Sequence, residues 1–226
     1  MTTSVKELKT QLPSYSKAEE VFNMISHIVG GAFAVAALVI MVVFSAIDHK
    51  VWSVVSSAIY GTALVIMFTI SSVYHGLPKG NAKKVMRIID HCDIYFLIAG
   101  TYTPILLCAI RPTSPAIAWT IFGVEWGLAA LAVTLNAIDL KKFEKMSMAC
   151  YIGMGWCVIA VIKSVIEAMS VRGFMILLFG GIAFTVGAVV YVIGKKVKYM
   201  HGVFHIFVVL GCALQFYAVF NYALLT

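Results

Sequence analysis

The stretch HGVFHIFVVLGCALQFYAVFNYAL, residues 201–224, sets both the fold and the first question about function. It has no Asp, Glu, Lys or Arg, and it exceeds the ~20 residues that a helix needs to cross a bilayer core. It begins with His201 and His205, whose four-residue spacing places them on one helix face, one turn apart. The stretch therefore predicts a membrane-spanning helix that carries two imidazoles at one end.

The rest of the chain has the same character. Of its 226 residues, 62% are hydrophobic and 12% charged, whereas soluble domains are about half apolar and one quarter charged. No alternating pattern of a β-barrel is present, and a helix satisfies its own backbone hydrogen bonds in lipid. We expect an all-α integral membrane protein, a seven-transmembrane-helix bundle over residues 24–226, preceded by an N-terminal segment, residues 1–23. The seven apolar segments are 24–46, 51–74, 88–110, 115–138, 146–169, 173–194 and 201–224.

Lysine and arginine predict the orientation of the bundle. Thirteen of them lie before the first span or in the loops after spans two, four and six, and three lie in the other loops. Because basic loops stay in the cytoplasm, we expect a cytoplasmic N-terminus, an external C-terminus and residence in the cell (inner or plasma) membrane. The net charge of +7 is then explained by topology and anionic lipid, and no nucleic-acid partner is needed. The thirteen are Lys6, Lys9, Lys17, Lys79, Lys83, Lys84, Arg87, Lys141, Lys142, Lys145, Lys195, Lys196 and Lys198.

Five of the six histidines fall at the cytoplasmic ends of these spans, on four different helices. They are His27, His75, His91, His201 and His205. Only His49 lies on the other side. Polar side chains in a membrane usually face the bundle interior or an aqueous cavity. We therefore expect these histidines to converge on one internal site.

Neutral imidazoles favour zinc, and three protein ligands with one open position are typical of catalytic zinc. His201 and His205 supply two ligands from one helix face, and His75 supplies a third from another helix. Asp90 is placed to act as an acid or base, or as an outer-shell group, and Ser71, one turn deeper than His75, could bind a water or substrate oxygen. Haem is disfavoured, because two imidazoles four residues apart on one helix cannot lie on opposite faces of a macrocycle.

A second polar stripe lies at the start of the first span. Glu20, Asn23 and His27 are spaced three and four residues apart, on one face of a helix. We expect them, with His91, to surround the metal site. The simpler alternatives stay open: a Glu near a helix N-terminus is favoured by the helix dipole, and His91 could be an interfacial residue with an ordinary hydrogen bond.

Four motifs in this order resemble the hemolysin III family of bacterial membrane proteins. They are EEVFNMISHIVG (19–30), SSVYHGLP (71–78), DHCDIYFLIAGTYTP (90–104) and HGVFH (201–205). That family is similar to the progestin and adiponectin receptors and, more distantly, to the alkaline ceramidases. The resemblance implies that zinc is held by His75, His201 and His205, with Asp90 and Ser71 close to it.

The resemblance leaves three functions open. The first is a zinc-dependent hydrolase of lipid amide or ester bonds, acting in membrane lipid homeostasis, with a membrane lipid as its fatty-acyl substrate or product. The second is a non-catalytic sensor or regulator of membrane fluidity. The third is a pore-forming hemolysin, which the sequence favours least because the spans are apolar nearly all round. Enzymatic activity is therefore expected but open, as is the oligomeric state.

Overall fold

The computed structural model describes residues 12–194 and 197–225, and these residues form helices and short connections without a strand. This confirms the all-helical prediction. Lys6, Lys9, Lys195 and Lys196, which were counted for the orientation, lie outside the described residues. The helices are α1 (Lys17–Ile47), α2 (Val51–Gly76), α3 (Asn81–Pro104), α4 (Pro115–Asp139), α5 (Glu144–Gly155), α6 (Ile162–Gly194) and α7 (Met200–Val219), with π-helical η1 (Ile105–Ile110) and η3 (Phe220–Leu224) and 3₁₀-helical η2 (Cys157–Val161).

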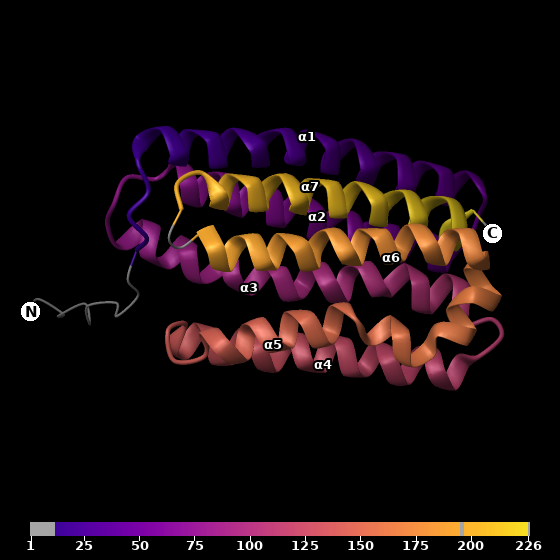
Figure 1. The fold of residues 1–226 in the computed structure, drawn as a ribbon. Helices are drawn as coiled ribbons and strands as arrows, with labels where there is room; N and C mark the ends of the chain where they lie inside the picture. Colours follow the sequence, from indigo (N-terminus) through magenta and orange to yellow (C-terminus); the bar gives the residue numbers. More distant parts are fainter. Residues whose placement is uncertain (1–11, 195–196, 226) are drawn as a thin grey trace, which may run out of the picture.

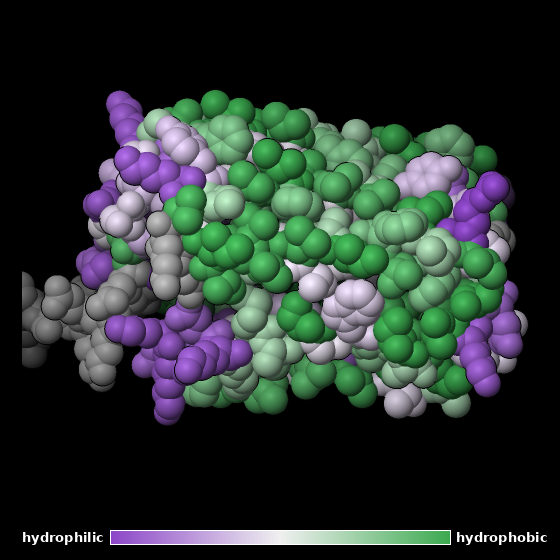
Figure 2. Space-filling model, viewed as in Figure 1, coloured by the Kyte–Doolittle hydropathy of each residue, from purple (hydrophilic) through white to green (hydrophobic). Residues whose placement is uncertain are grey.

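The outer surface has the polarity of a membrane protein. Six continuous helical segments in the described residues are long and apolar enough to cross a bilayer. Figure 2 shows hydrophobic residues over the middle of the molecule and hydrophilic ones at its two ends. An apolar belt between polar ends matches a hydrocarbon layer between two aqueous phases.

One of these six segments, Glu144–Gly194, is 51 residues long and folds back on itself. At Ser170 the backbone leaves the helical region, with φ 63° and ψ 165°. Trp156 Nε1 donates to Thr185 Oγ1 over 3.1 Å, although in a straight helix these residues would be about 44 Å apart. Two antiparallel limbs therefore meet at Ser170, one beside α4 and the other beside α7 (Figure 1).

Two helices begin earlier than their predicted spans. α1 begins at Lys17 rather than at residue 24, because Ser16 and Glu19 form a reciprocal capping box at its start. α3 begins at Asn81 rather than at residue 88. The longer α1 is important for the site, since it brings Glu20 and Asn23 into the same continuous helix as His27.

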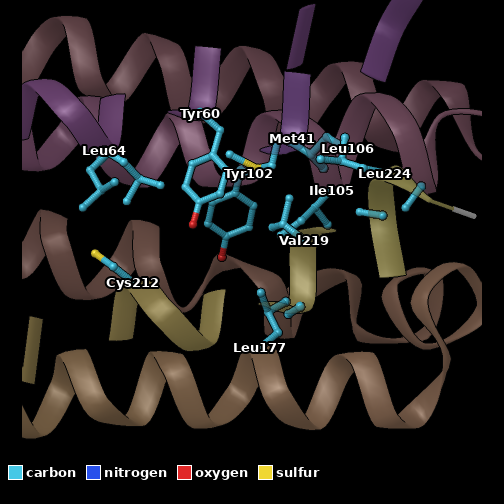
Figure 3. Packing of buried hydrophobic residues seen from close by; sticks show 14 of the residues in the cluster. Met41, Tyr60, Leu64, Tyr102, Ile105, Leu106, Leu177, Cys212, Val219 and Leu224 are labelled. Atoms are coloured by element: carbon cyan, nitrogen blue, oxygen red, sulfur yellow. The ribbon is translucent and has the colours of Figure 1, made fainter. Parts of the chain in front are cut away.

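Irregular backbone inside the bundle is satisfied by side chains. The regular part of α3 ends at Pro104 and continues as the π-helical turn η1. Between α5 and η2 the Tyr102 hydroxyl donates to the Gly155 carbonyl over 3.1 Å and accepts from the Val158 amide over 2.8 Å. Because exposed backbone groups are costly in lipid, this tyrosine stabilises the break. Figure 3 shows Tyr102 within the buried cluster beside Tyr60 and Ile105.

Candidate metal centre

Three histidines from two helices converge at the end of the bundle where α1 begins. His75 lies in the last turn of α2, and His201 and His205 lie in the first two turns of α7. One ring nitrogen of each lies within 4.8 Å of one ring nitrogen of the others. His75 and His205 are almost fully buried, and His201 is partly buried. The structure therefore brings together the three residues that the sequence predicted as metal ligands.

The donor geometry fits a metal ion. Nε2 of His201 and Nε2 of His205 are 3.1 Å apart. Two nitrogens bound to tetrahedral zinc, each at about 2.0–2.1 Å, would lie about 3.3 Å apart. Nε2 of His75 is buried and has no hydrogen-bond partner among the described residues. An unpartnered buried nitrogen is costly, and a metal ion at this point would satisfy it.

The opposite ring nitrogens of two of these histidines are held by α1. His75 Nδ1 donates to Glu20 Oε2 over 2.7 Å. His205 Nδ1 lies 3.2 Å from the Asn23 carbonyl and 3.1 Å from Ser26 Oγ. Because a carboxylate and a carbonyl can only accept, both rings carry their proton on Nδ1 and present the lone pair of Nε2. This is the arrangement that orients histidine ligands in known metal sites.

A buried lysine completes this arrangement. Lys83 is 3% exposed, and its Nζ lies 2.9 Å from Glu20 Oε1. It also donates to the carbonyls of His75 over 3.3 Å and of Leu77 over 3.0 Å. Those carbonyls are at the C-terminal end of α2, where a cation is favourable. Glu20 thus bridges an imidazole and an ammonium, and its charge is balanced within the site.

α1 also fixes the start of α7. Tyr199, which precedes α7, has a left-handed backbone with φ 63°, and its amide donates to Glu19 Oε1 over 2.9 Å. Gly202 allows the two helices to touch, since a Cβ there would overlap the ring of Phe22 and lie 3.0 Å from Asn23 Oδ1. The first turn of α7, and with it His201, is therefore set by contacts with α1.

His27 lies beside the three histidines rather than among them. Its ring stacks on His205 with centroids 3.7 Å apart and meets Phe68 edge-on at 5.2 Å. Both of its nitrogens are buried without a hydrogen-bond partner in the described chain. Asn23 contributes its backbone carbonyl to His205, and its side-chain nitrogen is likewise buried and unpartnered. The predicted stripe of α1 thus supports the site along three successive turns.

A cavity between the helices opens onto the histidines. Its walls include His201 and His205 together with Ser71, Asp90 and His91. The Asp90 carboxylate is partly exposed and lies 3.9 Å from His91 Nδ1, while that nitrogen donates to the Arg87 carbonyl over 2.9 Å. Asp90 is not in the group of three close ligands, so it lies near the site as a wall residue of the cavity.

Four residues that sequence reasoning did not assign to the site take part in it or lie next to it: Tyr15, Glu19, Lys83 and Asp93. Tyr15 stacks on His201 with centroids 5.0 Å apart, and burial raises the pKa of its hydroxyl. Asp93 is 3% exposed, lines the cavity, and has no partner for either carboxylate oxygen within the described ranges. The Ser-x-x-Glu capping pattern at residues 16–19 could have located Glu19. No local pattern identifies Lys83, because its partners lie on another helix.

These features define a class: a multi-pass helical membrane protein with a buried three-histidine site at one end of its bundle. A family model described as "Haemolysin-III related" matches residues 15–216, so the chain belongs to the hemolysin III family. Hemolysin-3 of Bacillus cereus is 34% identical over 97% of this chain and 98% of its own length. The Hemolysin-3 homolog of Bacillus subtilis is 35% identical over 90% and 94%.

A more distant relative is the human monocyte to macrophage differentiation factor, which is 27% identical over 80% of this chain and 77% of its own length. No solved structure matches the chain. The resemblance inferred from the four sequence motifs is confirmed by these comparisons.

Proposed function

We propose that this protein is a zinc-dependent hydrolase that cleaves an amide or ester bond of a membrane lipid and acts in membrane lipid homeostasis. The observation that carries the proposal is the group of three histidines, two of which, His201 and His205, line a cavity inside the bundle. Three histidine ligands are the protein set of known catalytic zinc sites. The location suits a substrate that remains in the bilayer.

The donor atoms support zinc as the metal. His75, His201 and His205 would hold it, and imidazole nitrogen suits zinc better than calcium or magnesium. When bound, the metal supplies Lewis acidity and lowers the pKa of a water ligand. Glu20 holds the ring of His75 in place through Nδ1 and adds the negative charge that a dication needs near it.

Asp90 and Ser71 are the proposed catalytic groups of the chain. Both line the cavity next to the histidines. The Asp90 carboxylate would take a proton during attack and return it to the leaving group, which general acid–base catalysis requires. Ser71, one turn before His75 on α2, would donate a hydrogen bond to a substrate oxygen.

The cavity walls support a lipid substrate. Beyond the histidine end they are mainly aliphatic and aromatic, including Leu97, Ile105, Val158, Leu177 and Val208. Apolar walls bind an acyl chain through the hydrophobic effect, at roughly 0.8 kcal/mol for each buried CH₂ group. The polar bond to be cleaved would then rest at the only end where histidines and carboxylates gather in the described cavity.

We also propose seven spans, with the histidine site on the cytoplasmic side. The two limbs joined at Ser170 support a fifth and a sixth span. α1 begins at one end of the bundle and η3 ends at the other (Figure 1), as an odd number of crossings requires. The excess of Lys and Arg in alternate loops supports the orientation.

The names of the two Bacillus relatives raise cytolysis as a second candidate. A pore of assembled helices needs polar faces, and the outward faces of α1, α2 and α4 carry large apolar side chains. These faces favour a resident membrane protein. A role as a non-catalytic sensor of membrane fluidity would use the same histidine site for structure.

The test is turnover by the purified protein in lipid nanodiscs. Zinc is counted, and fatty acid released from a ceramide and from a phospholipid is measured before chelation, after chelation and after zinc is restored. The proposal expects about one zinc per chain and fatty-acid release that follows zinc occupancy. Release that is unaffected by chelation, or zinc without any release, would overturn it. Dye leakage from intact vesicles would instead support cytolysis.

A further inference from the structure

The cavity has a second polar point far from the histidines. His205, Val208, Cys212 and Gln215 follow one another at intervals of three, four and three residues, on one face of α7. His205, Val208 and Gln215 all line the cavity. The ten residues from His205 to Gln215 correspond to about 15 Å along a helix. One wall of the cavity therefore begins with imidazoles and ends with an amide.

The orientation of this amide is fixed. Gln215 Nε2 donates to the Leu177 carbonyl over 3.2 Å. Because a carbonyl cannot donate, the amide cannot be turned over without losing this bond. Gln215 Oε1 is therefore the end of the amide that this bond does not hold. It is buried and accepts no hydrogen bond from the described residues, in a side chain that is 8% exposed.

Gly180 of α6 provides the space for this arrangement. A Cβ at Gly180 would lie 3.0 Å from both Cγ and Nε2 of Gln215, so the side chain lies flat against the helix where a larger residue would displace it. Two features, a glycine and a backbone acceptor on α6, therefore hold one glutamine in one position. Burying an amide with an unpaired oxygen costs free energy, and an apolar side chain at this position would avoid that cost.

The surroundings of Gln215 Oε1 favour a ligand that can donate a hydrogen bond to it. The nearby walls are apolar, including Ile105 and Leu177, which Figure 3 shows in the packed interior. Thr101 also lines the cavity, but its hydroxyl hydrogen is used by the Leu97 carbonyl over 2.7 Å. An unpaired acceptor in such a place penalises a ligand with only CH₂ groups and rewards a ligand that brings a donor.

We propose that Gln215 forms a specificity subsite that recognises a hydroxyl group in the middle of a long acyl chain. The carboxyl or amide end of the lipid would lie at the histidines, and the hydroxyl would donate to Gln215 Oε1. This inference rests on the proposed function, since it takes an acyl chain as the occupant of the cavity. It adds the substrate class: mid-chain hydroxylated acyl lipids rather than saturated ones.

The test compares two acids that differ in one group, stearic acid and hydroxystearic acid with its hydroxyl in mid-chain. Each competes against radiolabelled stearic acid on the purified full-length protein, with partition into protein-free micelles subtracted. The wild-type protein should prefer the hydroxylated acid by about three- to tenfold, the usual value of one net hydrogen bond. In Gln215→Met, which keeps the length of the side chain, the preference should reverse.

Asn221→Leu is the matched control. Asn221 is a polar residue of η3, just after α7, and its side-chain amide donates a hydrogen bond to the Tyr217 carbonyl. It should leave the preference unchanged. Equal binding of both acids to the wild type would overturn the subsite alone, including the case of a water held permanently by Gln215. Binding of neither acid would overturn the proposed lipid function as well. The wild-type comparison decides the matter even if Gln215→Met does not fold.

Discussion

Glu20 Oε2 and His75 Nδ1 are 2.7 Å apart, although 55 residues separate them in the chain. The same carboxylate pairs with Lys83 over 2.9 Å. One side chain of α1 therefore orients a ligand of α2 and neutralises a buried ammonium at the beginning of α3. This relationship makes α1 part of the site without supplying any of its three convergent nitrogens.

Glu20→Gln should weaken zinc binding by about ten- to a hundredfold, the usual effect of an outer-shell partner. It should also lower stability by about 3 kcal/mol, because Lys83 is left buried without its counter-ion. Adding Lys83→Met should restore stability but not zinc affinity. Chelator competition and thermal unfolding measure the two effects. Glu167→Gln, at an exposed position of α6, is the control; unchanged zinc affinity in Glu20→Gln would contradict the assignment.

His205→Ala should remove most of the zinc, since it deletes one of three converging ligands and no other close ligand stands in the group. Metal content per purified chain is the measurement. His49→Ala is the control, because it removes the same type of side chain from the exposed connection between α1 and α2. It should leave the metal content unchanged. Full zinc in His205→Ala would show that the metal lies elsewhere.

Asp90→Asn separates turnover from metal binding. Asparagine keeps the shape of the side chain but cannot act as a base. Zinc should therefore be retained, while release of fatty acid from a lipid amide or ester should fall by roughly 10²–10⁴. Zinc content and product release are measured on the same samples. Loss of zinc would make Asp90 a ligand, and full activity would remove it as the proton carrier.

Gly202→Ala should disturb the site through packing alone. The new methyl group would overlap Phe22 and push the first turn of α7 away from α1, and overpacking of this kind costs about 1–3 kcal/mol. Zinc affinity and the unfolding temperature should both fall. Gly127→Ala on α4 meets nothing within 4 Å and should be neutral or stabilising, because alanine favours a helix. Equal behaviour of the two variants would refute the close approach.

The proposed topology predicts the location of the C-terminus. A reporter that is active only outside the cytoplasm should be active when fused after Thr226. The same reporter should be silent when inserted in the segment 79–87, which carries Lys79, Lys83, Lys84 and Arg87. The opposite pattern would reverse the orientation, and activity at both places would indicate an even number of crossings between them.

The sequence by itself determined the helices and three ligand candidates. Apolar runs of the length of a bilayer and the four-residue spacing of His201 and His205 are local properties, and a lipid environment forces such runs to be helical. The charge-based orientation predicted His75 on the same side of the membrane as that pair, and the family motifs implied the same three ligands. The apolar run from residue 24 leaves out the first seven residues of α1, which begins at Lys17, where Ser16 and Glu19 form a capping box.

Only the tertiary structure decided which atoms meet. The partnership of Glu20 with Lys83, the contact of Glu19 with the Tyr199 amide, and the unpaired oxygen of Gln215 all depend on residues far apart in the chain. Such contacts follow from how helices pack and rotate against one another, which glycines such as Gly202 control by allowing close approach. Helical periodicity gives the face on which a residue lies, but the neighbour of that face is set by the packing of the whole bundle.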